Sequence, residues 1–112
     1  MAKAPDLLVH WHTADHQSLL QALESHAYTF GNEIRFVDGD LVGIEVECSD
    51  PDKTIPNNLA QDRAAGLQHI IFAVLPKAEE RAIKQLEQLT SDHQGLYVIN
   101  VLTLLDALRG SS

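Results

Sequence analysis

The sequence predicts a single α/β domain built on a mixed, mostly parallel sheet of about four strands. Two unbroken apolar runs, HIIFAVL at 69–75 and GLYVINVL at 95–102, flank an amphipathic segment at 77–89. Unbroken apolar strands are typical of a parallel sheet covered on both faces, and a strand–helix–strand unit predicts a right-handed crossover. The 112 residues, 45% of them hydrophobic, suit one modest core. We expect one domain over 1–112, with an ordered core at about 8–109.

The expected order of elements is α-β-β-α-β-α-β-α. A first helix is predicted within 13–31, where Leu and Ala recur at helical spacing. A hairpin follows, with strands within 32–37 and 40–48, because the intervening Asp38-Gly39 is a strong turn signal. We find no convincing additional strand ahead of this hairpin.

The second half of the chain alternates helices and strands. After a loop at 49–54, a helix is predicted over 55–66, with Pro56 near its first turn. The amphipathic segment forms the next helix, because its apolar residues repeat on one face. A short last helix is predicted over 103–110.

Composition limits the partners and the location of the protein. Sixteen acidic residues against eight basic ones give a formal net charge of −8. Such a surface repels nucleic-acid phosphate on average, so a DNA contact would be local or made by a partner. No apolar run approaches the roughly 20 residues that span a bilayer, and the N-terminus lacks a signal-peptide pattern. The one cysteine, Cys48, fits a reducing compartment. We expect a cytoplasmic protein with no membrane contact.

Two glutamates, Glu45 and Glu47, interrupt an otherwise apolar strand. Side chains alternate across a strand, so these two share one face. In the expected hairpin, Glu33 falls opposite Gly43–Ile44 and therefore close to Glu45. Converging carboxylates repel one another unless a divalent cation, a basic residue or water neutralises them, and Mg²⁺ or Mn²⁺ prefers such oxygen ligands. The simpler alternative is a half-exposed strand whose carboxylates point to solvent.

The segment NEIRFVDGDLVGIEVECS, residues 32–49, resembles the PD-(D/E)XK, or restriction-endonuclease-like, nuclease fold. In that pattern Asn32-Glu33 stands in the place of Pro-Asp. The stretch IEVE at 44–47 stands in the place of the acid-x-lysine triplet. The resemblance covers roughly residues 14–109. The family members that this chain resembles include domains that accompany conjugative-transfer and other mobile-element ATPases.

The resemblance implies a metal-dependent nuclease that acts in DNA processing. Glu33 and Glu45 would hold Mg²⁺ or Mn²⁺, and a metal-activated water would attack a phosphodiester. Glu47 would be a third carboxylate, at the position where the family has its catalytic lysine. Lys53, in the following loop, is the candidate substitute for that lysine. Enzymatic activity therefore stays open.

The competing hypothesis is an interaction module of the same fold that has lost the chemistry. It would dock on a larger ATPase, on a relaxase-type protein or on a second copy of itself, forming a homo-oligomer. The missing lysine, the acidic surface and the scattered basic residues favour this hypothesis. A zinc site at His12 and His16 is not expected, because the predicted helix start at Thr13 leaves His12 outside the helix.

Overall fold

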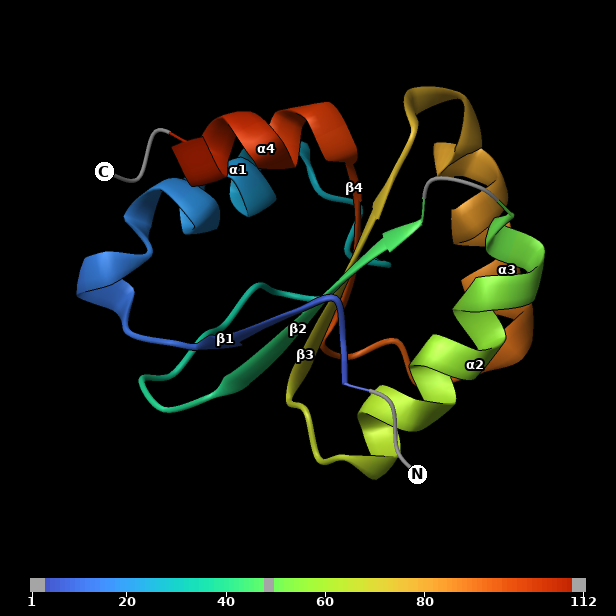
Figure 1. Cartoon of the computed structure of the whole chain (residues 1–112), viewed down its shortest axis with the longest axis horizontal. Helices are drawn as coiled ribbons and strands as arrows, with labels where there is room; N and C mark the ends of the chain where they lie inside the picture. The colour runs from blue at the N-terminus through green and yellow to red at the C-terminus, as the bar shows by residue number, and fades with distance from the viewer. Residues whose placement is uncertain (1–3, 48–49, 110–112) are drawn as a thin grey trace.

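The computed structural model describes residues 4–47 and 50–109, so Cys48 lies outside the described residues. The elements follow the order β-α-β-α-β-α-β-α (Figure 1). The strands are β1 (Leu7–His10), β2 (Leu41–Glu47), β3 (His69–Val74) and β4 (Leu96–Asn100). The helices are α1 (Gln17–His26), α2 (Pro51–Ala64), α3 (Glu79–Leu89) and α4 (Val101–Arg109), with short 3-10 turns at Thr13–Asp15 and Pro76–Ala78. Within the described ranges, no helix is long and apolar enough to cross a membrane.

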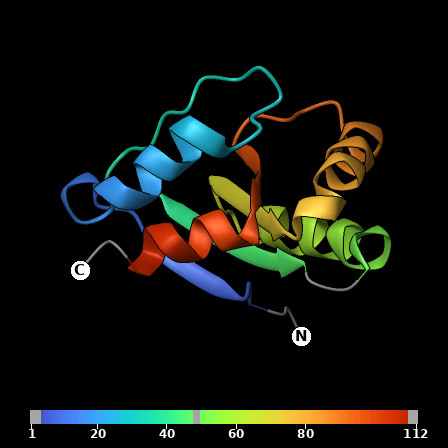
Figure 2. The same ribbon diagram turned by 90° about the horizontal axis from the view of Figure 1, so that it is seen from above.

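The four strands form one mixed sheet in the order β1-β2-β3-β4. β1 is antiparallel to β2, whereas β2, β3 and β4 run parallel to one another. As Figure 2 shows, α1 and α4 lie side by side on one face of the sheet, and α2 and α3 lie on the other. The predicted α/β class and the four-stranded mixed sheet are therefore confirmed.

Each face of the sheet has its own core, because successive side chains of a strand point to opposite faces. Ile71 of β3 belongs with Trp11 and Leu23 to the core beneath α1 and α4. Phe72, the next residue along, belongs with Ile55 to the core beneath α2 and α3. All six residues of β3 are buried, as its unbroken apolar run predicts.

The predicted hairpin is wrong. Residues 32–37 form no strand, and β2 pairs instead with β1, a strand absent from the sequence prediction. The pair Gly43–Ile44, expected opposite Glu33, lies opposite Leu8 and Leu7. The observed order therefore begins with a strand and not with a helix.

The physical reason lies in the turn at Asp38-Gly39, which forms but does not pair its flanks. Asp40 donates its backbone N–H to the Val37 carbonyl at 2.9 Å. Of the two central residues only Gly39 has a positive φ, at 97°, whereas a type I′ hairpin turn needs positive φ at both. The turn instead contacts the N-terminal segment, where Asp38 Oδ1 accepts the Thr13 N–H at 2.8 Å.

Helix boundaries also differ from the prediction. α2 begins at Pro51, because the Asp50 side chain accepts the Asp52 N–H and caps the helix. Pro56, expected near the start, therefore lies inside the helix. The first helix is shorter than predicted, since a 3-10 turn precedes α1 and irregular chain follows it.

Candidate functional site

Glu45 and Glu47 share one face of β2, as predicted, but that face is the protein interior. Each residue is 3% exposed, beneath α2, whereas Val46 on the opposite face is 38% exposed. The alternative prediction, a half-exposed strand whose carboxylates point to solvent, is therefore wrong. The site around these two glutamates is a buried junction between β2 and α2.

Glu47 is held by two side chains of α2. Its Oε2 accepts a hydrogen bond from the Thr54 hydroxyl, and its Oε1 accepts one from the Asn58 amide at 2.8 Å. Thr54 and Asn58 are four residues apart, so both lie on the side of the helix that faces β2. Protein donors thus satisfy both carboxylate oxygens, which fits a structural role at the start of α2.

Glu45 lies against a second carboxyl group, that of Asp62 on α2. Asp62 is 1% exposed, and its Oδ2 has no hydrogen-bond donor within the described residues. Burial, reinforced by Asp62 and then by Asp6, raises the pKa of Glu45 to about 8. Burial also raises the pKa of Asp62. A protonated Glu45 can donate to Asp62, which allows two carboxyl groups to occupy one buried site.

The other two residues predicted for the site lie elsewhere. Glu33 is exposed, pairs with Arg35 at 3.2 Å, and lines a pocket on the face that α1 covers. Lys53 is exposed on the first turn of α2. Within residues 4–47 and 50–109, no three His, Cys, Asp or Glu side chains are arranged to hold a metal ion. Glu33 and Glu45, on opposite faces of the sheet, do not fit a shared Mg²⁺ or Mn²⁺ ion.

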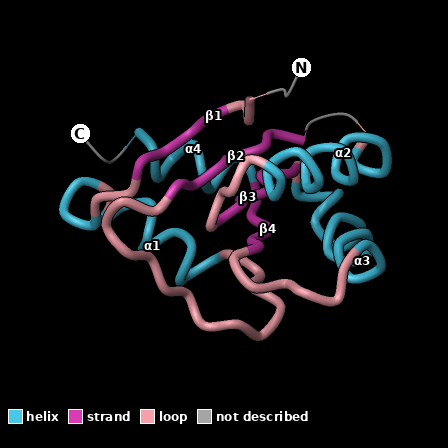
Figure 3. The backbone as a smooth tube through the Cα atoms, turned by 90° about the horizontal axis from the view of Figure 1, so that it is seen from below, coloured by secondary structure: helices cyan, strands magenta, loops and turns pink. Residues whose placement is uncertain are grey.

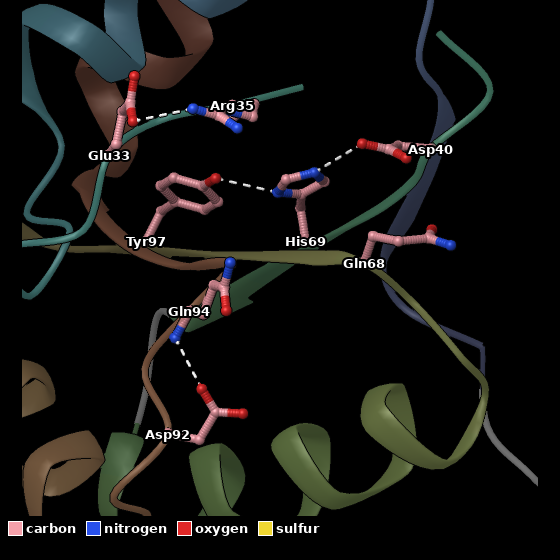
Figure 4. A pocket seen from close by; sticks show the side chains of 9 residues that line it. Glu33, Arg35, Asp40, Gln68, His69, Asp92, Gln94 and Tyr97 are labelled. Atoms are coloured by element: carbon pink, nitrogen blue, oxygen red, sulfur yellow. Dashed lines mark hydrogen bonds and ion pairs between the residues drawn. The ribbon is translucent and has the colours of Figure 1, made fainter. Parts of the chain in front are cut away.

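A polar pocket of about 360 Å³ lies at the amino ends of β3 and β4 (Figure 4). Its floor is a chain of three side chains. Asp40 Oδ2 lies 2.9 Å from His69 Nε2, and His69 Nδ1 lies 2.9 Å from the Tyr97 hydroxyl. The exposed rim consists of Glu33, Arg35, Gln68, Asp92 and Gln94.

The proton positions in this chain follow from the chemistry of its ends. An ionised carboxylate only accepts, so Asp40 favours a proton on His69 Nε2, and the tautomer with that proton leaves Nδ1 free to accept the Tyr97 O–H. Burial, with a smaller contribution from the Asp40 charge, raises the pKa of Tyr97 to about 12. The phenol therefore keeps its proton at neutral pH and is a poor nucleophile.

The contacts around the linked side chains of Asp40, His69 and Tyr97 indicate that they have a structural role. The Phe36 ring stacks on Trp11 at 4.2 Å and lies 4.1 Å from the His69 ring. These contacts hold the irregular segment after α1 against the sheet. Ligands of open α/β sheets usually bind at the carboxyl ends of the strands, and this pocket lies at the opposite ends.

Asp62 was accessible to sequence reasoning, although it is absent from the predicted site. Ile55, Leu59 and Asp62 follow the i, i+4, i+7 spacing of one helix face, and all three are buried. An acid on that stripe indicates an inward carboxyl group. The chain of Asp40, His69 and Tyr97 has no such local signal, because its members are brought together only by the sheet.

Comparison of the chain with protein families, with curated proteins and with solved structures finds no match. Evidence for the function therefore comes from the residues of this chain alone. The features that bear on it are the buried carboxylates of β2 and the surfaces that the fold leaves uncovered.

Proposed function

We propose that the chain is a small domain of restriction-endonuclease-like descent that acts as a non-catalytic protein-interaction module. Its setting would be DNA processing, or the transfer of conjugative or mobile elements. Its partner would be a larger ATPase, a relaxase-type protein or a second copy of the chain. The resemblance of the IEVE stretch at 44–47, on β2, to the nuclease motif supports the setting, whereas residues 32–37 form no strand.

One observation carries the non-catalytic part of the proposal. The two carboxylates of the IEVE stretch are both engaged inside the protein: Glu47 by Thr54 and Asn58, and Glu45 by Asp62. A catalytic metal site needs carboxylates that are ionised and open to the ion. The net charge of −8 supports the same conclusion, because it disfavours a phosphate-tracking surface.

A different observation favours the second candidate, metal-dependent phosphodiester hydrolysis. Glu45 and Asp62 place two carboxyl groups together with Asp6 close by, and one Asp62 oxygen lacks a donor in the described part of the chain. Carboxylate oxygens are the ligands that Mg²⁺ and Mn²⁺ prefer. Burial opposes this candidate, because Glu45 and Asp62 are only 3% and 1% exposed and a hydrated ion needs ligands that it can reach.

The deciding experiment is a calorimetric Mn²⁺ titration, combined with incubation of plasmid DNA in Mg²⁺ or Mn²⁺. We expect neither saturable heat nor cleavage from the wild type. The variant Glu45→Gln removes the carboxyl group that would bind metal in the nuclease and that is engaged by Asp62 in the non-catalytic module. Glu33→Gln is the matched control at an exposed residue. Saturable binding with cleavage that Glu45→Gln abolishes and Glu33→Gln leaves intact would overturn the proposal in favour of the nuclease.

A further inference from the structure

The two edges of the sheet differ in whether another segment of the chain pairs with them. At the β4 edge, Tyr28 and Val98 exchange two backbone hydrogen bonds, of 2.8 and 3.0 Å, so chain after α1 covers this edge. At the other edge, no segment of the described residues pairs with the outer side of β1. Figure 3 shows β1 as the outermost strand of the sheet. The open edge of β1 is therefore the place where another strand can join.

The hydrogen bonds of β2 show which backbone groups of β1 point outward. Trp11 donates its N–H to the Asp40 carbonyl at 2.8 Å, so Trp11 directs its backbone toward β2. In an antiparallel ladder this direction alternates, so Val9 does the same. The backbone N–H and C=O groups of Leu8 and His10 therefore point away from the sheet.

The side chains of β1 make this edge apolar. Leu7 and Leu8 are 47% and 48% exposed. They lie on opposite faces of the sheet, since successive residues of a strand alternate. Natural edges usually carry Lys, Pro or a bulge that prevents pairing, and the strand LLVH has no such residue. The exposed leucines and the outward backbone groups fit an added strand.

We propose that the occupant of this edge is a second copy of the chain, paired antiparallel about a two-fold axis at Leu8. In this register Leu8 faces Leu8 of the copy, and Leu7 faces Val9 of the copy. Asp6, whose Oδ2 also accepts the Val46 N–H of its own β2 at 2.8 Å, faces the exposed His10 of the copy, so each end of the short ladder places an acid opposite a base. An identical strand is thus complementary to itself, as a two-fold interface requires.

The same register uses the outward backbone groups efficiently. Leu8 is an outward-facing residue, so the central pair exchanges two backbone hydrogen bonds across the axis. The result is one continuous sheet through two copies of the domain. Since each copy carries a net charge of −8, added salt should strengthen the association. This inference rests on the proposed function, in that it names the partner of the interaction module.

The test is sedimentation equilibrium of the full chain between about 10 and 500 µM, the range suited to a small interface. We expect the mass to rise from 12.4 kDa toward twice that value, and more steeply in salt. Leu8→Pro removes the outward N–H without removing a bond to β2, and should stay monomeric throughout. If Leu8→Pro fails to fold, Leu8→Lys serves the same purpose. Leu102→Lys, at a position of α4 that is 58% exposed, is the matched control and should dimerise like the wild type.

Amide hydrogen exchange supplies a second readout. In a dimer the amides of Leu8 and His10 become protected as concentration rises, whereas Val9 is protected at every concentration. A chain that stays monomeric with unprotected Leu8 would overturn the inference and leave the proposed function standing, since another protein could then use the edge. A dimer that survives both Leu8 variants would also overturn it. Metal-dependent cleavage, by contrast, would overturn the proposed function whatever the oligomeric state.

Discussion

The carboxyl group of Glu45 lies against that of Asp62 in the interior between β2 and α2. This pair links the fold to pH. Glu45 has a pKa of about 8 in the folded protein, against an ordinary value of 4.5. Between these values the folded state holds a proton that the unfolded state has released. Stability should therefore be greatest below about pH 4.5, as far as this group is concerned, and fall as the pH rises toward about 8.

Replacing Glu45 by Gln should remove this dependence. The glutamine amide can donate to Asp62 at every pH, so the free energy of unfolding at about pH 8 should rise by about 1–3 kcal/mol. Urea unfolding at several pH values between about 5 and 9 measures the effect. Glu87→Gln, on the exposed face of α3, should keep the wild-type dependence. If the free energy of unfolding of Glu45→Gln changed with pH as steeply as that of the wild type, the proposed proton shared by Glu45 and Asp62 would be wrong.

The donors to Glu47 should be important for stability. Asn58→Ala removes the amide that binds Glu47 Oε1 and leaves a buried carboxylate partly unsatisfied. We expect the free energy of unfolding to fall by about 1–3 kcal/mol. The neighbouring Asn57 is exposed, so Asn57→Ala should change stability by less than about 0.5 kcal/mol. Equal effects of the two substitutions would argue against the Glu47 contact.

The hydroxyl of Tyr97 should contribute through His69. Tyr97→Phe keeps the ring in its core but removes the hydroxyl that is hydrogen-bonded to His69 Nδ1. The expected loss is about 0.5–1.5 kcal/mol, the usual net value of one buried hydrogen bond. Tyr28→Phe, at a tyrosine that is 42% exposed, serves as the control. Chemical denaturation of the two variants compares their stabilities. A Tyr97→Phe variant as stable as Tyr28→Phe would show that the hydrogen bond between Tyr97 and His69 does not contribute to stability.

Gly95 should tolerate no side chain. Its φ is +78°, and an added Cβ would lie 2.3 Å from the Gln68 carbonyl oxygen. Gly66 also has a positive φ, of +81°, but an added Cβ there meets nothing within 4 Å. Gly66→Ala should therefore cost about 1–2 kcal/mol from backbone strain alone, and Gly95→Ala should cost clearly more. Thermal unfolding of the two variants tests this order, and equal melting temperatures would contradict the close approach.

The candidate site divides into a predicted part and an unpredicted part. The shared face of Glu45 and Glu47 follows from strand alternation, which is a local property of the chain. The predicted position of Glu33, close to Glu45, is wrong because it depends on the hairpin. The Asp38-Gly39 turn forms, but the segments on either side of it do not pair. Glu33 and Glu45 lie on opposite faces of the sheet and do not fit one shared metal ion, whereas the catalytic roles of Glu47 and Lys53 stay predictions.

The sequence alone determined the α/β class, the two buried strands β3 and β4, and the amphipathic helix α3. These follow from unbroken apolar runs and from helical periodicity, which need no knowledge of distant residues. Only the tertiary structure decided that the four residues of β1 pair with β2, that α2 covers Glu45 and Glu47, and that Asp40 reaches His69. Strand pairing and burial depend on which segments meet in space, and alternation along a strand does not say what will cover either face.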